Sequence, residues 1–269
     1  MIFARDKSQM CNNLLQYAHV YAWGREHGRK VISMRFSYKY QFFHICHTPL
    51  TGFGWYLLAK CSAALRLLPT ANFKHSDCDR EALERKMLQH RHIVVSGWYV
   101  RFYDLFLKYR SEICELFRID SKFTETVRKK MTDKGIRLGV HIRRGDYARW
   151  KDGIYCYSDE TYANHINRFV GWHENEEVHV YLSTNDNKVT EEKFRKLCPH
   201  AHIHHLHGNP PEDLFMLSEC DYLIGPPSTF SLVAAMYRDI PLYRMETNDA
   251  KQMGSDSFRL FDYWFRRIV

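Results

Sequence analysis

The feature that most constrains the fold is the regular alternation of short apolar stretches with helical patterns in the second half of the chain. Val178, Val180 and Leu182 alternate with polar residues, as they would in a half-buried strand. The predicted strands are 138–142, 177–183, 202–206, 222–224 and 241–244, and the predicted helices between and after them are 159–170, 190–197, 212–220 and 229–237. Strands and helices that alternate at this spacing predict a doubly wound parallel α/β sheet.

The start of the chain predicts a second α/β unit. Residues 2–4 and 31–34 have the apolar character of short strands, and a helical pattern from Met10 to about Gly28 joins them. Residues 36–118 mix aromatic and basic residues; within them we predict only a strand at 92–95 and a helix that Trp98-Tyr99 lead into and that runs through about Phe117.

The domain boundary is predicted in the charged segment that follows Asp120. This segment contains a helix that ends at Gly135, and the last predicted helix, residues 258–265, is amphipathic and packs back onto one of the domains. We therefore predict an N-terminal domain over residues 1–120 and a C-terminal domain over residues 121–269.

Two adjacent arginines, Arg143 and Arg144, end the predicted strand 138–142, and a Gly-Asp turn follows them. Ligands of α/β folds lie beyond the carboxyl ends of strands, and the planar guanidinium group matches phosphate oxygens in pairs. The stretch therefore predicts a site for an anionic, phosphorylated ligand. The alternative is that the arginines pair with acidic neighbours such as Asp146, and this stretch alone supports both interpretations equally.

Two further polar clusters follow strands of the same predicted sheet. Ser228, Thr229 and Ser231 stand at the start of a helix, where backbone N–H groups and the helix dipole favour a phosphate, although an ordinary helix cap would look the same. Ser183, Thr184 and Asp186, at the end of the strand at 177–183, could bind a sugar or a base or could simply form a turn. Because all these strands end at one edge of the sheet, the arginines and the helix start together favour a phosphate site.

The net charge of +8 and the pI near 9.0 favour an anionic partner: a nucleic acid, a membrane surface or a phosphorylated substrate. No block of Lys and Arg dominates, which argues against a nucleic acid. The eight cysteines include no CxxC pair, so zinc-ribbon and thioredoxin-like sites are excluded. The apolar start is too short for a signal peptide, and no apolar run approaches the ~20 residues of a membrane span. We expect a cytoplasmic protein, with peripheral association at the inner face of the membrane left open.

A run of histidines suggests a metal site. His200, His202 and His204 would lie on one face of a strand, where they could bind zinc. No cysteine or carboxylate stands at a recognisable spacing from them, so we prefer a strand edge that leads into a loop beside the predicted phosphate site, and we expect no metal.

The motifs His141-Ile-Arg-Arg-Gly-Asp-Tyr147, Ser183-Thr-Asn-Asp186 and Pro226-Pro-Ser-Thr-Phe-Ser231 resemble those of the α-1,2-fucosyltransferases and of their relatives, the α-1,6- and protein O-fucosyltransferases. Residues 11–18 look like a variant of another motif of this family. The resemblance implies a GT-B fold: two Rossmann-like α/β domains face a cleft, the first on the acceptor side, the second binding the nucleotide-sugar. It also implies inverting transfer of L-fucose from GDP-β-L-fucose to a glycan acceptor, in an α-1,2 linkage to galactose, with no metal or other cofactor.

The resemblance assigns roles to the matching residues. Arg143 would neutralise the leaving diphosphate, and His141 and Arg144 would orient the nucleotide or the pocket. Asn12 or Asn13 would reach in from the first domain. The β-phosphate would be cradled by the four residues of the helix start, Ser228, Thr229, Phe230 and Ser231.

An inverting reaction also needs a group that deprotonates the acceptor hydroxyl. Asp146 is the first candidate, although it could equally hold the arginines in place. Weaker candidates are Asp152, Glu160 and Glu26. Two other functions stay open: a GT-B enzyme that uses another nucleotide-sugar, and a non-enzymatic protein that binds nucleic acid or an anionic membrane.

Overall fold

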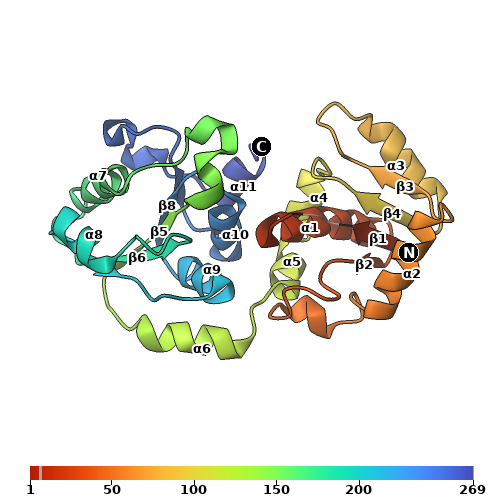
Figure 1. Cartoon of the computed structure of the whole chain (residues 1–269), viewed down its shortest axis with the longest axis horizontal. Coiled ribbons are helices and arrows are strands. Elements are labelled where there is room, and N and C mark those ends of the chain that lie inside the picture. Colours follow the sequence, from red (N-terminus) through yellow and green to blue (C-terminus); the bar gives the residue numbers. More distant parts are fainter. Residues whose placement is uncertain (6–7, 269) are drawn as a thin grey trace. The chain divides into compact units, whose positions relative to one another are not determined.

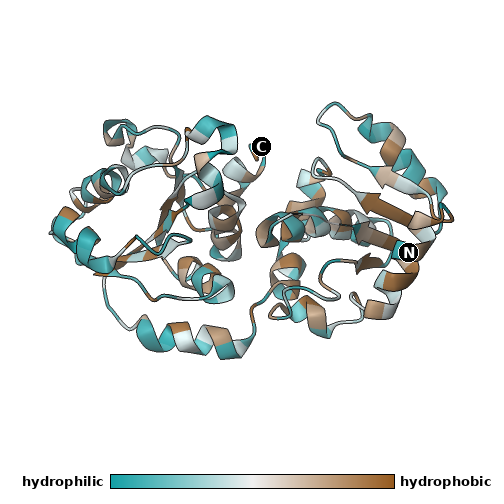
Figure 2. Cartoon of the chain, viewed as in Figure 1, coloured by the Kyte–Doolittle hydropathy of each residue, from teal (hydrophilic) through white to brown (hydrophobic). Residues whose placement is uncertain are grey.

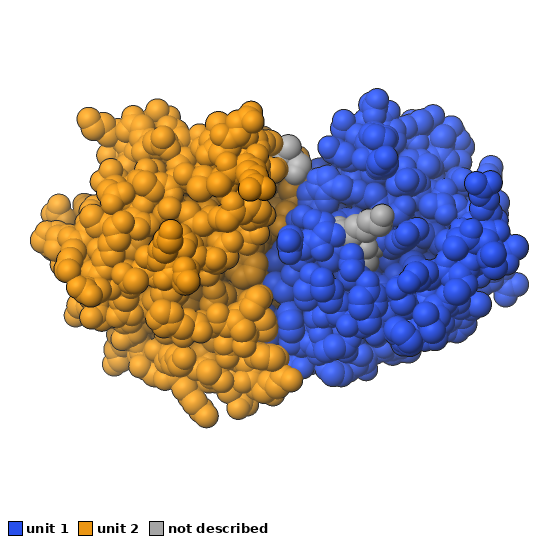
Figure 3. All heavy atoms as spheres, viewed as in Figure 1, with its two compact units in different colours: residues 1–120 blue, residues 121–269 orange. Residues whose placement is uncertain are grey.

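The computed structural model describes residues 1–5 and 8–268. The chain divides into two compact units, Met1–Asp120 and Ser121–Val269 (Figure 1; Figure 3). Each unit is built on a parallel sheet of its own. Figure 2 shows that the middle strands of the first sheet are strongly hydrophobic, whereas helix α3 (Arg80–Gln89) is mostly hydrophilic.

The sheet of the first unit has the strand order β2-β1-β4-β3, and every pair in it is parallel. The strands are β1 (Ile2–Arg5), β2 (Val31–Ser33), β3 (Thr70–Asn72) and β4 (Ile93–Ser96). Strand β1 lies in the middle, with Ile2 in register with Val31 on one side and with Ile93 on the other. The strands predicted at 2–4, 31–34 and 92–95 are therefore confirmed to within a residue, and β3 was not predicted.

The central helix of the first unit is α1 (Met10–Glu26), which is buried along most of its length. Gly24 allows it to approach the sheet closely, because a Cβ atom there would lie only 2.3 Å from the Val31 side chain. Gly28 follows the helix in a left-handed conformation, with φ of +62°. The other helices are α2 (Phe53–Ala64), α3, α4 (Tyr103–Lys108) and α5 (Arg110–Leu116), and a short 3₁₀ segment spans His44–His47.

The predicted helix through Phe117 is wrong in its continuity, and it starts a few residues after Trp98-Tyr99. Residues 97–102 are not helical, and the helical part consists of α4 and α5, which meet at Tyr109. Gly97 explains the late start: it has φ of +110°, and a Cβ atom there would lie 2.2 Å from the Phe73 backbone.

Helix α2 leaves several large apolar side chains exposed. Of its residues only Ala59 is buried, whereas Phe53 is 57% and Leu58 is 53% exposed. The exposure continues past the helix to Leu65 and Leu67. Figure 2 shows the helix as mostly hydrophobic. Because apolar residues occur on all sides of it, no amphipathic period marks it in the sequence.

The sheet of the second unit has the strand order β7-β6-β5-β8-β9, again with parallel pairs throughout. The strands are β5 (Ile136–Ile142), β6 (Val178–Thr184), β7 (His202–His204), β8 (Tyr222–Gly225) and β9 (Leu242–Arg244). The order reverses between β5 and β8, the switch point at which doubly wound sheets bind ligands. The predicted doubly wound sheet is confirmed.

The helices of the second unit begin at polar caps. The hydroxyl of Ser158 accepts a hydrogen bond from the Thr161 N–H at the start of α7 (Asp159–Val170), and Asn209 forms a capping box at α9 (Pro210–Ser218). Gly139 in β5 lets α9 approach the sheet, since a Cβ atom there would lie 2.8 Å from Leu217. The other helices are α6 (Ser121–Lys130), α8 (Glu191–Leu197), α10 (Thr229–Arg238) and α11 (Phe261–Phe265), with 3₁₀ segments at Gly145–Ala148, Trp150–Gly153, Ala250–Gln252 and Ser255–Ser257.

Two predicted helices are shorter than expected. Helix α6 ends at Lys130 instead of Gly135, because the backbone carbonyls of Met131 and Asp133 accept hydrogen bonds from the Arg137 side chain. Helix α11 begins at Phe261 instead of 258, because Arg259 forms a β-bridge with Leu242. Phe261 and Phe265 of α11 are buried, and the helix packs against α10. Among the described residues, no helix combines the length and the apolar character needed to cross a membrane.

Candidate active site

The carboxyl ends of β5 and β8 lie next to each other in the second sheet. The two strands pair in parallel, with Val140 opposite Ile224, so both chains leave the sheet at the same edge. Gly225 makes this approach close, because a Cβ atom at this position would lie 3.1 Å from the Cβ of His141. The edge therefore brings the arginines after β5 near the start of helix α10 after β8.

Arg143 is held by the turn that follows it. Its Nη2 atom lies 2.9 and 3.0 Å from the two carboxylate oxygens of Asp146, and its guanidinium carbon lies 5.7 Å from the centre of the Tyr147 ring. The Tyr147 hydroxyl donates a hydrogen bond to the Pro227 carbonyl, directly before α10. The Arg143 side chain is 26% exposed, so this cation is oriented by the protein and still reaches solvent at the edge.

The position of Asp146 bears on its two possible roles. Its carboxylate contacts Arg143 and is 56% exposed, which favours a role in orienting the arginine over a role as the base. The weaker candidates for the base lie apart from this contact. Asp152 has a left-handed backbone in an exposed turn, Glu160 contacts Lys193, and the Glu26 carboxylate, in the first unit, accepts hydrogen bonds from Lys108 and Tyr109.

Arg144 makes a different set of contacts, and its side chain is mostly buried within the second unit. Its Nη2 atom lies 2.5 Å from the carboxylate of Asp159, and these side chains are only 19% and 11% exposed. The Lys193 ammonium group lies 2.7 Å from the other oxygen of the same carboxylate. The Asn185 side chain accepts a hydrogen bond from the Arg144 backbone N–H at 2.8 Å and donates one to its carbonyl at 3.2 Å. Arg144 therefore positions the strand end, and neither Asp159 nor Asn185 was predicted as part of the site.

The start of helix α10 carries the predicted phosphate-binding residues. The Ser228 hydroxyl accepts a hydrogen bond from the Phe230 N–H, and the buried Ser231 hydroxyl donates one to the Ser228 carbonyl, each at 3.2 Å. Thr229 and Phe230 are partly buried. Ser228 thus caps the helix, and the positive end of the helix dipole faces the edge where Arg143 lies.

His141 is the buried polar group beneath this edge. It is 5% exposed, and its ring centre lies 5.1 Å from that of Phe230. Burial, assisted by the charge of Arg143, lowers the pKa of His141 to about 3, so the imidazole is neutral at physiological pH. Its Nδ1 atom is buried and has no hydrogen-bond partner in the part of the chain that the structure describes. A buried nitrogen of this kind could hydrogen-bond a ligand.

Thr184 and Asp186 shape the turn after β6. The Thr184 hydroxyl accepts a hydrogen bond from the Asp186 N–H at 3.1 Å, and the Asp186 carboxylate accepts one from the Lys188 N–H at 3.0 Å. Thr184 is in register with Ile142, so the turn lies beside the end of β5. These hydrogen bonds are those of a turn, which favours the alternative that Thr184 and Asp186 simply form a turn.

Asn12 and Asn13 lie in the first unit, on the first turn of α1. Both side-chain amides donate hydrogen bonds to Ser8, the first to its hydroxyl at 2.9 Å and the second to its carbonyl at 3.0 Å. Asn13 is fully buried, and its Oδ1 atom has no hydrogen-bond partner within residues 1–5 and 8–268. Asn12 and Asn13 belong to the first unit, whereas Arg143 and α10 belong to the second.

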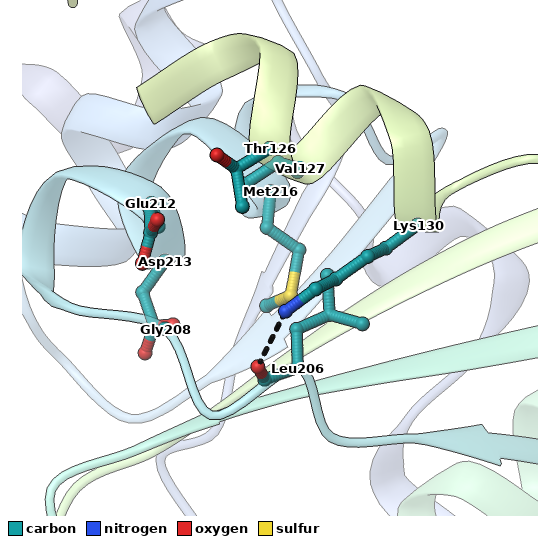
Figure 4. Close-up of a pocket in the computed structure, with 8 residues that line it drawn as sticks. All are labelled: Thr126, Val127, Lys130, Leu206, Gly208, Glu212, Asp213 and Met216. Atoms are coloured by element: carbon teal, nitrogen blue, oxygen red, sulfur yellow. Dashed lines mark hydrogen bonds between the residues drawn. The ribbon is translucent and has the colours of Figure 1, made fainter. Parts of the chain in front are cut away.

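A residue that was not predicted, Asp213, has the most perturbed carboxyl group at this end of the sheet. It accepts a hydrogen bond from the buried Ser183 hydroxyl at 2.8 Å, and burial raises the pKa of Asp213 to about 7. It lines a small pocket, and Figure 4 shows Lys130 reaching across this pocket towards Leu206, whose carbonyl accepts a hydrogen bond from it. The pocket is lined by Thr126, Val127, Lys130, Leu206, Gly208, Glu212, Asp213 and Met216.

Asp213→Asn is expected to remove part of the pH dependence of stability. Because the folded pKa of about 7 lies above the ordinary value of 3.8, the folded state binds the proton more tightly. The contribution of Asp213 to stability is thus complete below about pH 4 and is lost as the pH rises through 7. The variant should gain stability relative to wild type between pH 5 and pH 8, by about 2 kcal/mol. Urea unfolding of both proteins at pH 5 and at pH 8 measures this gain. The prediction is contradicted if the difference in unfolding free energy between the variant and wild type is the same at both pH values.

The architecture is similar to that of solved fucosyltransferases. A mutant of FUT1 from Arabidopsis thaliana in complex with GDP has a TM-score of 0.66 at 10% identity, and the match covers 96% of this chain and 72% of the FUT1 chain. POFUT1 in complex with GDP-fucose has a TM-score of 0.62 at 13% identity, and the match covers 89% of this chain and 94% of the POFUT1 chain. The fucosyltransferase NodZ from Bradyrhizobium has a TM-score of 0.55 at 15% identity, and the match covers 91% of this chain and 96% of the NodZ chain. At such identities the likeness concerns the fold, and it confirms the predicted GT-B class.

None of the curated proteins compared matches the sequence of this chain. The profile of the family described as "Glycosyl transferase family 11" matches residues 71–246, which is more than half of the chain. The matched range begins in β3, ends just after β9 and contains both Arg143 and the start of α10. It confirms the resemblance that the sequence motifs indicated. The chain belongs to glycosyl transferase family 11.

Proposed function

We propose that the protein transfers L-fucose from GDP-β-L-fucose to a hydroxyl group of a glycan, with inversion, and that it forms an α-1,2 linkage to galactose. The observation that carries this proposal is the pairing, at one sheet edge, of an oriented Arg143 with the start of helix α10. The family supports a glycosyltransferase. The proteins of similar fold that were solved with GDP or GDP-fucose support this donor.

The proposed chemistry follows from where charge develops. The bond between the fucose anomeric carbon and the β-phosphate oxygen breaks, its electron pair stays on that oxygen, and the acceptor oxygen forms a bond to the opposite face of the sugar while its proton passes to solvent. Negative charge therefore grows on the β-phosphate. Arg143 and the N-terminus of α10 would stabilise this charge more strongly in the transition state than in the bound donor. His141 would hydrogen-bond the donor through its buried nitrogen.

The other residues of the edge have supporting roles in this proposal. Asp146 orients Arg143, while Asp159 and Asn185 hold Arg144 and with it the end of β5. Because a guanidinium group and a helix dipole supply the positive charge, we expect transfer to need no divalent metal and no other cofactor.

The experiment that tests the proposal is incubation of the purified protein with GDP-fucose and a panel of oligosaccharide acceptors, with and without EDTA. Half of the panel should end in galactose and half in another sugar. We expect GDP release that depends on a galactose-ending acceptor and is unchanged by EDTA, with an α-1,2 product by linkage analysis. Absence of acceptor-dependent GDP release across the panel would refute fucosyl transfer, and another linkage would refute only the finer proposal.

A thermal-shift comparison of nucleotides tests the donor separately. GDP should raise the melting temperature at concentrations at which UDP and ADP have little effect, because a ligand stabilises only the folded state that binds it. An equal response to UDP or ADP would favour another nucleotide-sugar. Strong, salt-sensitive binding to DNA or to anionic vesicles, with no response to GDP, would favour the non-enzymatic alternative.

A further inference from the structure

A second cluster of ionisable side chains lies at the opposite end of the second sheet from Arg143. Asp133 stands in the loop between α6 and β5, His179 is the second residue of β6, and His204 is the last residue of β7. The His179 Nδ1 and His204 Nε2 atoms are 3.1 Å apart. The Asp133 Oδ2 atom lies 3.9 Å from the first nitrogen and 3.7 Å from the second. One atom from each residue therefore points to a common centre.

These separations fit one metal coordination sphere. In a tetrahedral site with metal–ligand bonds of about 2.0–2.1 Å, neighbouring ligand atoms are about 3.3–3.4 Å apart. The three observed separations bracket this value, so small adjustments of the side chains would be enough to hold an ion. Two imidazoles and a carboxylate form a donor set typical of Zn²⁺, with a fourth position left for water.

We propose that Asp133, His179 and His204 form a Zn²⁺ site that is separate from the candidate active site. The site would join the loop after α6 to strand β6 and to the edge strand β7. It differs from the predicted trio, because His200 precedes β7 and His202 stacks on the His179 ring at 4.9 Å without joining the ligand group. The carboxylate of this group has no recognisable spacing from the histidines, because Asp133 comes from a segment some seventy residues earlier in the chain.

The surroundings of His179 suit a metal ligand. An imidazole that binds metal through Nδ1 carries its proton on Nε2. In this structure the His179 Nε2 atom is buried and has no hydrogen-bond partner among the described residues, and the Glu177 carboxylate lies 3.8 Å away. A small movement of the exposed Glu177 side chain would complete the carboxylate–histidine–zinc arrangement that commonly supports such ligands.

The other two ligands are also held in place. The Tyr181 hydroxyl donates a hydrogen bond to Asp133 Oδ2 at 2.6 Å, and the Tyr181 ring stacks on His204 with a centre-to-centre distance of 4.7 Å. The His179 side chain is only 8% exposed. Rigid partners reduce the entropy lost when an ion binds, which favours tight binding.

The test is a calorimetric titration of ZnCl₂ into untagged, chelator-treated protein, paired with the visible absorption of the Co²⁺ form. We expect one saturable Zn²⁺ and an intense tetrahedral Co²⁺ spectrum. His179→Gln, His204→Gln and Asp133→Asn should each weaken binding about 100-fold or more, because loss of a supporting partner alone costs about 10–100-fold. Glu177→Gln should weaken it about 10-fold, and His200→Gln, a nearby exposed histidine outside the group, should have no effect.

The melting temperature of each metal-free variant shows whether it folds. If His179→Gln does not fold, Asp133→Asn and the exposed Glu177→Gln still decide the matter, because neither removes a buried ring. The site is overturned if wild type binds no Zn²⁺ saturably, if the folded ligand variants bind like wild type, or if Co²⁺ gives a weak octahedral spectrum. Zn²⁺ should also raise the melting temperature of wild type and leave that of Asp133→Asn unchanged.

Discussion

Arg143→Lys is expected to lower the turnover number for fucosyl transfer by about 10²–10³-fold, the loss that follows removal of one transition-state hydrogen-bond donor. Arg143 contacts Asp146 through one nitrogen of a planar fork and still reaches solvent at the sheet edge. A lysine ammonium group keeps the charge but offers no rigid fork, so it cannot hold the carboxylate and the β-phosphate in the same geometry. Initial rates at saturating GDP-fucose and acceptor measure the effect.

Arg149→Lys is the matched control for this substitution. Arg149 directly follows the turn that holds Arg143, and it is exposed. Its replacement preserves the charge in the same segment, so turnover should stay within about twofold of wild type, as for a surface substitution. Near-normal transfer by Arg143→Lys would remove this arginine from its assigned role. An equal loss in both variants would mean that the segment as a whole, and not Arg143, carries the effect.

Asp159→Asn is expected to destabilise the second unit by about 3 kcal/mol, the loss typical of a buried ion pair from which one partner is removed. The substitution keeps the size of the side chain but removes the charge that neutralises Arg144. These side chains are 19% and 11% exposed, so water can solvate the remaining guanidinium group only poorly. Urea-dependent hydrogen exchange of peptides from β5 and α7 measures the stability of this unit alone.

Glu160→Gln provides the comparison for Asp159→Asn. Glu160 is the next residue of α7, and it contacts only Lys193 among the cations of this cluster, at 3.4 Å on the exposed surface. Exposed ion pairs contribute little to stability. We expect almost no change in exchange for Glu160→Gln. A similar loss in both variants would show that the acidic first turn of α7, and not the pair with Arg144, is what stabilises the unit.

The second half of the chain could be predicted from the sequence because its elements are locally encoded. Strand β6 shows a period of two, α7 begins at a Ser cap, and both lie within a residue of their predicted ranges. Residues 36–72 lack such signals. Strand β3 has three residues, and helix α2 has apolar side chains on exposed and buried faces alike. Tertiary contacts fix these elements, and they leave no periodic trace in the sequence.

The candidate site likewise contains residues that the sequence reveals and residues that it does not. Strand ends and helix starts are local features, so Arg143 and Ser228 could be found at the ends of predicted elements. Their supporting residues act across long sequence distances: Asn185 binds the Arg144 backbone from 41 positions away, and Asp213 meets Ser183 from 30. The raised pKa of Asp213 depends on burial, which no spacing of residues reveals.

The strand order of the second sheet also bears on how the chain folds as it is made. Strand β5 pairs with β6 on one side and with β8 on the other, and the contact between Arg137 and Asp221 beside this pairing joins residues 84 positions apart. At ordinary rates of synthesis, β8 follows β5 after roughly 4–17 s. During that time one edge of β5 has no partner and is open to pairing with other chains. Nascent chains that end between β5 and β8 should therefore be the most dependent on chaperones.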